Sequence, residues 1–347
     1  MVAADVKVNG FKVGVDQWTF HHLGHLSAIE ILELLQAHGL EGYQFGDARQ
    51  ISRTLDPGEV REVREHALAH GMYIEGGVQC FNPHQFGQAA LEDGDGDLRL
   101  GTRRHLEALA NVVLESRAVR CVMGMPCNRT TPVPWPQQIA DTISVTRDLA
   151  PILRDLDLKL AFETHAEATS DELLQMIEEI GSDVVGICLD TGNFPMTLED
   201  PLAAVRRVAG YAIATHLKDG VVMFAEDGLV YQARPCGQGA IPMHPILKEI
   251  LRSSPDLRTL SIEDHDGLFP IRIFRDEFVA TFGDQPAVEF AHVIRMAREC
   301  EQRVASGALP SPEALEAVPW VDQALPRLEQ SARYVREQVA AAASVTY

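Results

Sequence analysis

Four polar residues end apolar runs in the second half of the chain. Glu163 closes LKLAFE, Asp190 closes VVGICLD, His216 closes YAIATH, and Glu263 follows the apolar part of LSIEDH. Successive members are 27, 26 and 47 residues apart. Three carboxylates and one imidazole suit a single hard divalent ion rather than a closed structural zinc site. We therefore expect one Mn²⁺ ion, with Mg²⁺ or Co²⁺ as alternatives.

The elements that must position these residues alternate between short apolar runs and segments with helical periodicity. Most of the runs are continuously apolar, as in parallel strands covered on both faces. This alternation predicts an α/β fold, a (β/α)₈ TIM barrel, whose active site lies at the carboxyl ends of the strands. The eight expected strands are residues 11–15, 42–45, 72–78, 119–124, 158–163, 184–190, 211–217 and 259–263.

The four residues stand at the ends of the fifth to eighth expected strands, so their side chains should converge at the mouth of the barrel. Each has a structural explanation when taken alone. A carboxylate after a strand often caps a helix or faces solvent, and a lone histidine is usually hydrogen-bonded within the fold. Four such residues at matching positions are harder to explain in that way, and we predict a joint metal site.

The remaining segments are expected to be helices and loops. Helices are expected at residues 27–38, 57–70, 98–116, 136–156 and 170–180, with Ser27 and Ser170 as caps. Long loops are expected at residues 82–97 and 218–243. Residues 1–284 would form the barrel, and residues 285–347 a helical extension that packs on the barrel or on a partner subunit. We expect a homo-oligomer, with a hetero-oligomer containing a second subunit as the alternative.

Composition excludes several classes of protein. The 30 basic and 50 acidic residues give a net charge of −20, which argues against nucleic-acid and anionic-membrane partners. No apolar run approaches the roughly 20 residues of a membrane helix, and residues 1–10 lack the pattern of a secretory signal. The six cysteines form no CxxC pair. We expect a cytoplasmic protein without a disulfide framework.

Several short motifs resemble a known family. They are FETH at 162–165, LDTGN at 189–193, HLKD at 216–219, CGQGA at 236–240 and IED at 262–264. This series is similar to that of the xylose isomerase-like TIM barrels, the sugar phosphate isomerase and epimerase family, over about residues 11–280. The superfamily also includes ketose 3-epimerases, inosose dehydratases, dehydroshikimate dehydratases and C-glycoside-cleaving enzymes.

The resemblance implies that Glu163, Asp190, His216 and Glu263 are the metal ligands, and that Glu163 and Glu263 also exchange protons with the substrate. Proton removal next to a carbonyl would give a metal-stabilised enediolate. We expect an isomerase or epimerase acting on a sugar, polyol or keto-sugar. The alternative is a lyase, either a dehydratase or the metal-bearing subunit of a C-glycoside-cleaving enzyme. A non-catalytic scaffold and a DNA-cleaving endonuclease fit the intact ligand set and the acidic charge less well.

Six further residues are candidates for substrate binding, and each has a structural alternative. His165 could contact a hydroxyl or form part of the barrel rim, and Lys218 could shape the site or form a rim salt bridge. Asn193 occupies a position where many ketose epimerases have histidine. Arg234 resembles a basic residue that contacts substrate oxygens in the superfamily. Trp18 and His22 lie in the aromatic loop after the first strand. Glu75, near the end of the third strand, is left without a role.

Overall fold

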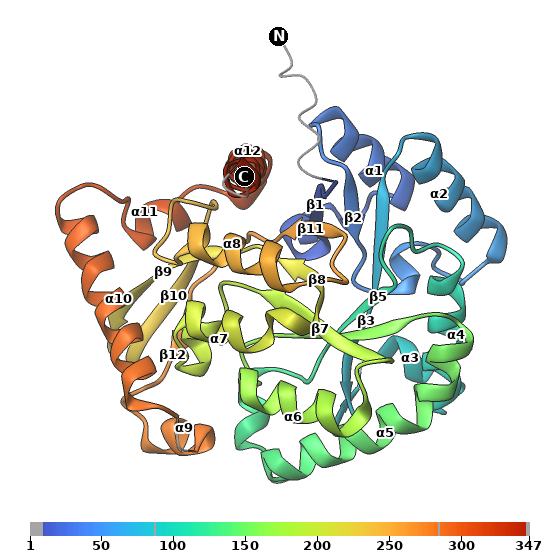
Figure 1. The fold of residues 1–347 in the computed structure, drawn as a ribbon, viewed down its shortest axis with the longest axis horizontal. Coiled ribbons are helices and arrows are strands. Elements are labelled where there is room, and N and C mark those ends of the chain that lie inside the picture. The colour runs from blue at the N-terminus through green and yellow to red at the C-terminus, as the bar shows by residue number, and fades with distance from the viewer. Residues whose placement is uncertain (1–9, 87, 284, 345–347) are drawn as a thin grey trace.

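The computed structural model describes residues 10–86, 88–283 and 285–344. Its centre is a ring of eight parallel strands, which Figure 1 shows surrounded by helices. They pair in the order β11-β1-β2-β3-β5-β6-β7-β8. An isolated bridge between Leu217 and Ile262 links the two ends of this order, so the barrel is nearly closed. The strands are β1 (Lys12–Asp16), β2 (Gly42–Gln44), β3 (Tyr73–Asn82), β5 (Ala118–Val122), β6 (Lys159–Glu163), β7 (Val185–Asp190), β8 (Ala212–His216) and β11 (Thr259–Ile262). The predicted TIM barrel is confirmed.

Helices surround this ring and cover the outer faces of the strands (Figure 1). Every residue of β7 is buried, as a parallel strand covered on both sides requires. The helices that follow the first seven strands are α1 (Ala28–Ala37), α2 (Pro57–Ala69), α3 (Gln88–Asp93), α4 (Leu98–Ala110), α5 (Trp135–Asp155), α6 (Ser170–Ile180), α7 (Pro201–Val208) and α8 (Met243–Ser253). The predicted helix at 98–116 is therefore shorter than expected.

Helix caps explain where two of these helices begin. Ser27 and Glu30 form the predicted cap of α1, in which each side chain accepts a hydrogen bond from the backbone of the other residue. The predicted cap of α6 was one residue too late. Thr169 is the capping residue and pairs with Glu172, whereas Ser170 is helical and its hydroxyl contacts the buried carboxylate of Glu199.

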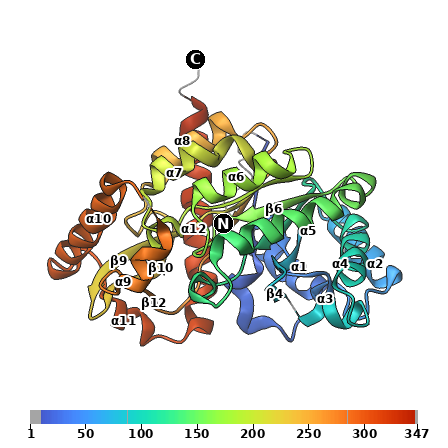
Figure 2. The same cartoon turned by 90° about the horizontal axis from the view of Figure 1, so that it is seen from below.

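The segment 218–243, predicted to be a loop, contains a β-hairpin instead. Strands β9 (Asp219–Ala225) and β10 (Gly228–Arg234) pair with each other, and β12 (Phe269–Ile271) pairs with β10 to complete an antiparallel sheet. Tyr231, Leu229 and Val222 form part of a small apolar core beneath it. This sheet lies on the opposite side of the molecule from α2 and α4 (Figure 2). The prediction missed the apolar runs VVMFA and LVY of this hairpin, because it assigned strands only where a helical segment follows.

The segment 82–97 is also more regular than predicted. The end of β3 pairs with the short strand β4 (Gln85–Phe86), and α3 follows. Asp93, at the end of α3, accepts hydrogen bonds from Arg49 and His105. These contacts, which join residues distant in the sequence, hold the polar segment against the barrel.

The C-terminal helices pack on two different parts of the fold. They are α9 (Asp276–Val279), α10 (Ala287–Ala305), α11 (Pro312–Glu316) and α12 (Trp320–Ser344). Helix α10 contacts β9 of the hairpin, whereas α12 contacts β1, β11 and α8 of the barrel. Figure 1 shows α12 end-on beside α8. The last helix thus occupies the outer face between the eighth strand and the first, and the domain boundary at residue 284 stays a prediction.

No helix in the described parts of the chain is both long and apolar enough to span a membrane.

Candidate metal centre

The structure brings together four side chains from neighbouring barrel strands. Glu163, Asp190 and His216 end β6, β7 and β8, and Glu263 directly follows β11. One possible ligand atom from each residue lies within 4.8 Å of the others, and all four residues are buried. The convergence follows from barrel geometry, because the carboxyl ends of parallel strands open at one face.

His216 is the centre of this group. Its Nδ1 atom lies 2.8 Å from Glu263 Oε2, 3.5 Å from Glu163 Oε1 and 4.0 Å from Asp190 Oδ2. Within the described residues this buried nitrogen has no hydrogen bond of acceptable geometry. A nitrogen and three carboxylates that point at one buried position offer ligand atoms to a cation there. Nitrogen and carboxylate donors in this ratio suit a divalent ion, so the residues present fit the expected group.

Two buried cations contact the carboxylates from other sides. Arg120 Nε lies 2.5 Å from Glu163 Oε2, and its Nη2 contacts the same oxygen. Lys218 Nζ lies 2.6 Å from Glu263 Oε1 and 2.7 Å from Asp190 Oδ2. The contacts of Arg120 and of Lys218 are charge-assisted and short, and they fix the three carboxylates in place.

These cations decide the charge of the carboxylates. Burial raises the pKa of Glu163, but the charges of Arg120 and His216 outweigh burial and hold that pKa below its ordinary value. For Glu263 the charges of Lys218 and His216 have the same effect against burial, and its pKa is also lowered. Burial dominates at Asp190 and raises its pKa to about 6, although Lys218 opposes the rise. Glu163 and Glu263 are thus ionised near neutral pH.

The LDTGN turn after β7 orients Asp190. The backbone N–H of Gly192 donates to Asp190 Oδ1 at 2.7 Å, and Asn193 Nδ2 donates to Asp190 Oδ2 at 2.8 Å. Asn193 Nδ2 also lies 3.4 Å from Glu163 Oε1. The amide therefore holds two of the acidic residues together.

The sequence matches the model of a family described as "Xylose isomerase-like TIM barrel" over residues 32–278. The chain belongs to this family. The expected resemblance is thereby confirmed.

Two curated relatives and one solved structure show how diverse the similar proteins are. The uncharacterized protein YihM of Escherichia coli (strain K12) is 23% identical over 255 residues, which cover 69% of this chain and 76% of YihM. The 3-oxo-isoapionate decarboxylase of Pectobacterium atrosepticum is 23% identical over 194 residues, 56% of this chain and 61% of that protein. The structure of D-psicose 3-epimerase with D-tagatose from Clostridium cellulolyticum H10 has 14% identity and a TM-score of 0.55, covering 83% of this chain and 99% of the epimerase.

The residues predicted to bind substrate in this xylose isomerase-like barrel lie at different distances from the four grouped side chains, which are Glu163, Asp190, His216 and Glu263. Lys218 contacts two of them directly, as described above. His165 Nδ1 contacts Glu167. Burial lowers the pKa of His165, but the charges of Glu167 and Glu163 outweigh burial and raise that pKa. Arg234 is buried on the hairpin and donates to the Pro310 carbonyl at 3.1 Å, toward the segment before α11.

Trp18 and His22 belong to η1 (Gln17–Leu23), the 3₁₀ turn after β1. The Trp18 side chain is 47% exposed, and its ring lies 5.5 Å from that of His21. The His22 ring lies 6.1 Å from Phe20. The structure does not bring these two residues into the four-residue group.

The CGQGA motif is explained by Asp219. Its buried carboxylate accepts hydrogen bonds from the backbone N–H groups of four residues at 2.7–3.0 Å, and these are Gly220, Gly237, Gly239 and Ile241. The HLKD and CGQGA motifs are therefore two halves of one structural unit. Cys236 of this loop donates its thiol hydrogen to the Leu217 carbonyl at 3.4 Å, so the loop lies beside the segment that carries His216 and Lys218.

Sequence reasoning missed three residues around the centre: Arg120, Gln44 and His265. Arg120 interrupts the apolar run AVRCV, and a charged residue within a strand is a signal that could have found it. Gln44 ends β2 as the predicted ligands end theirs. His265 Nε2 lies 3.7 Å from Glu263 Oε1, and burial and the charge of Lys218 lower its pKa to about 4.

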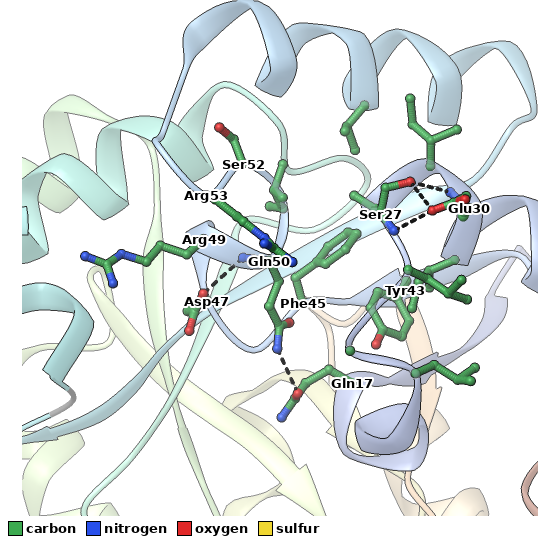
Figure 3. A pocket seen from close by; sticks show the side chains of 18 of the residues that line it. Gln17, Ser27, Glu30, Tyr43, Phe45, Asp47, Arg49, Gln50, Ser52 and Arg53 are labelled. Atoms are coloured by element: carbon green, nitrogen blue, oxygen red, sulfur yellow. Dashed lines mark hydrogen bonds between the residues drawn. The ribbon is translucent and has the colours of Figure 1, made fainter. Parts of the chain in front are cut away.

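A separate cavity of about 740 Å³ lies between η1, α1 and the segment after β2 (Figure 3). Tyr43 and Phe45 line it, and Gln50 donates a hydrogen bond to Gln17 at its edge. Among the described residues that line this cavity, none is one of the four grouped residues. It is thus distinct from the candidate metal centre.

Proposed function

We propose that this chain is a divalent-metal-dependent isomerase or epimerase of carbohydrate metabolism, with Mn²⁺ as its ion. The convergence of Glu163, Asp190, His216 and Glu263, with His216 Nδ1 facing carboxylate oxygens of the other three, supports the proposal. The substrate is a sugar, polyol or keto-sugar, and the protein acts in the cytoplasm as a homo-oligomer. The epimerase neighbour supports the same substrate class.

Glu163 and Glu263 are the proposed proton carriers. When bound, the ion supplies Lewis-acid stabilisation of the oxygen that becomes negatively charged as a proton leaves the adjacent carbon. A carboxylate with one oxygen toward the ion keeps the other for proton transfer. Glu263 is the better placed carrier, because its Oε1 contacts Lys218 Nζ, whose ammonium protons exchange. His165, Asn193 and Lys218 are the proposed polar contacts of the substrate nearest the ion, and Trp18, His22 and Arg234 are proposed more distant contacts.

A lyase is the second candidate, and Arg120 favours it. Both contacts from the Arg120 guanidinium go to Glu163 Oε2. Arginine keeps its protons at every physiological pH, so this oxygen is already occupied by a group that cannot pass a proton on. Epimerisation by two carboxylates needs a proton-transfer group on each face of one carbon, whereas elimination or decarboxylation needs fewer proton-transfer groups. The similar decarboxylase of P. atrosepticum supports this candidate.

The test is metal-dependent exchange of solvent deuterium. The purified protein is analysed for metal, and ketoses, inososes, 3-oxo sugar acids and aryl C-glycosides are then incubated with it in D₂O and Mn²⁺. The ion is removed by chelation before NMR spectra are recorded. We expect deuterium at the carbon next to a carbonyl, and no label when the chelator is present from the start.

The products separate the two candidates. An isomer or epimer with all its carbon atoms supports the first, and loss of water, an aglycone or carbon dioxide supports the second. A protein that binds no divalent ion and converts no compound of the panel would contradict both. Glu33→Gln removes an exposed negative charge on α1, far from the proposed proton carriers in sequence, and is the control for Glu163→Gln and Glu263→Gln.

A further inference from the structure

A chain of hydrogen bonds leads away from His216 into the barrel interior. His216 Nε2 lies 2.5 Å from Gln44 Oε1, and Gln44 Nε2 donates to Glu75 Oε2 at 2.8 Å. All three side chains are at most 2% exposed. Gln44 and Glu75 are direct neighbours in the register of β2 and β3, so their side chains point to the same side of the sheet.

The neighbours of Glu75 fix the direction of this chain. Thr259 and Ser261, on β11, both donate hydroxyl hydrogens to Glu75, as Gln44 does. Tyr73 supplies a further hydroxyl at 2.7 Å from Ser261 Oγ. Glu75 is therefore an acceptor toward each of these partners. Burial raises the pKa of Glu75, and the hydrogen bonds from Thr259, Gln44 and Ser261 oppose that rise. With Glu75 as the acceptor, the NH₂ group of Gln44 faces Glu75 and its carbonyl oxygen faces His216.

The orientation of Gln44 decides which nitrogen of His216 carries a hydrogen. Nε2 faces the acceptor Gln44 Oε1, and Asp16 Oδ2, another acceptor, lies 3.9 Å away. Nε2 must therefore be protonated, and Nδ1 is the nitrogen left for a cation among Glu163, Asp190 and Glu263. An amide rotated by 180° would place its NH₂ against Nε2 and disfavour this arrangement.

We propose that Glu75 is a positioning residue that acts through Gln44 to select Nδ1 of His216 as the metal-binding nitrogen. The inference rests on the proposed metal site and adds to it a residue that touches none of the four ligands. Three buried polar side chains in a barrel interior are costly unless each is hydrogen-bonded. Because these side chains lie behind His216, they orient its imidazole, and the orientation of a ligating imidazole controls metal affinity.

The experiment compares Glu75→Gln with the wild-type protein. A glutamine at position 75 can donate as well as accept, so it no longer forces the Gln44 amide into one orientation. We expect Mn²⁺ affinity, measured by calorimetry, to fall by roughly 10- to 100-fold. Glu199→Gln is the matched control, because Glu199 is a similarly buried carboxylate whose partners among the described residues are Ser170, Thr197 and Arg207. It should lose stability without losing metal affinity.

A spectroscopic readout separates this role from a general loss of structure. In ¹⁵N-histidine-labelled protein loaded with diamagnetic Zn²⁺, wild-type His216 should show a proton on Nε2 and coordination at Nδ1. Glu75→Gln should show a weakened or exchanging Nε2 proton. If that variant does not fold, Gln44→Met tests the same chain, since it leaves Nε2 without its acceptor.

Three outcomes would overturn the inference. The first is a wild-type spectrum with the proton on Nδ1. The second is unchanged affinity and an unchanged Nε2 proton in the folded variants, which would refute the role of Glu75 while leaving the metal site intact. The third is a wild-type protein that binds neither Mn²⁺ nor Zn²⁺, which would refute the proposed function as well.

Discussion

Arg327 of α12 donates two hydrogen bonds to Asp264, the residue that follows the candidate ligand Glu263. Nε lies 2.9 Å from Asp264 Oδ2, and Nη2 lies 2.6 Å from Asp264 Oδ1. Nη2 also donates to the Ala233 carbonyl of the hairpin at 2.8 Å, and the guanidinium lies over the Trp320 ring. One side chain thus joins the last helix, the hairpin and the end of the eighth barrel strand.

Arg327→Met should destabilise the protein strongly. Asp264 is 1% exposed, so the substitution leaves a buried carboxylate without its charged partner. Loss of one member of a buried ion pair costs about 3–5 kcal/mol. Urea unfolding followed by circular dichroism measures the change. Arg252→Met is the control, because the Arg252 side chain is 71% exposed, and a loss within about 0.5 kcal/mol is expected there. Equal losses in the two variants would contradict the prediction.

Glu163→Gln and Glu263→Gln should abolish turnover and leave a folded protein. Each substitution removes a negatively charged donor from the group around His216. Metal affinity should fall by more than the roughly 10- to 100-fold typical of residues that only support a ligand. Calorimetry with Mn²⁺ and circular dichroism check the two parts. The mechanism would be wrong if both variants kept full activity.

Metal binding should release a proton from His216. Burial would lower the pKa of His216, but nearby negative groups, including Glu163 and Glu263, outweigh it and raise that pKa well above its ordinary value. The metal-free imidazole therefore keeps a second proton at neutral pH, and a metal ligand must lose it. Affinity should rise with pH up to that raised pKa. Calorimetry in two buffers of different ionisation enthalpy counts the protons, and identical apparent enthalpies would contradict this.

Gly237→Ala should disturb the contact between the CGQGA loop and α12. Gly237 has a φ of +84°, and an added Cβ would lie 2.5–2.6 Å from two ring atoms of Tyr334. Gly39→Ala is the matched control, since Gly39 has a φ of +71° and, apart from Gly39 and its two neighbours in sequence, no atom of the described chain lies within 4 Å of the added Cβ. The difference in unfolding free energy isolates the ring contact, and we expect about 1–3 kcal/mol. A difference near zero would show that Tyr334 moves freely.

The local pattern of the sequence was sufficient to predict the barrel and its four grouped residues. A continuous apolar run followed by a helical segment already encodes a buried parallel strand and its connection. The mouth of such a barrel collects whatever ends the strands, so Glu163, Asp190, His216 and Glu263 could be grouped without coordinates. The Ser27 cap of α1 was equally local, since it depends on residues three positions apart.

Only the tertiary structure showed contacts between residues far apart in the chain. Gln44 and Glu75 meet His216 and Thr259 across the barrel, and neither spacing nor periodicity relates residues separated by 172 or 184 positions. The Arg327–Asp264 pair and the hairpin sheet have the same character. Strand ends have local signatures because they depend on backbone geometry, whereas the direction of a buried hydrogen-bond chain depends on every partner in the folded interior.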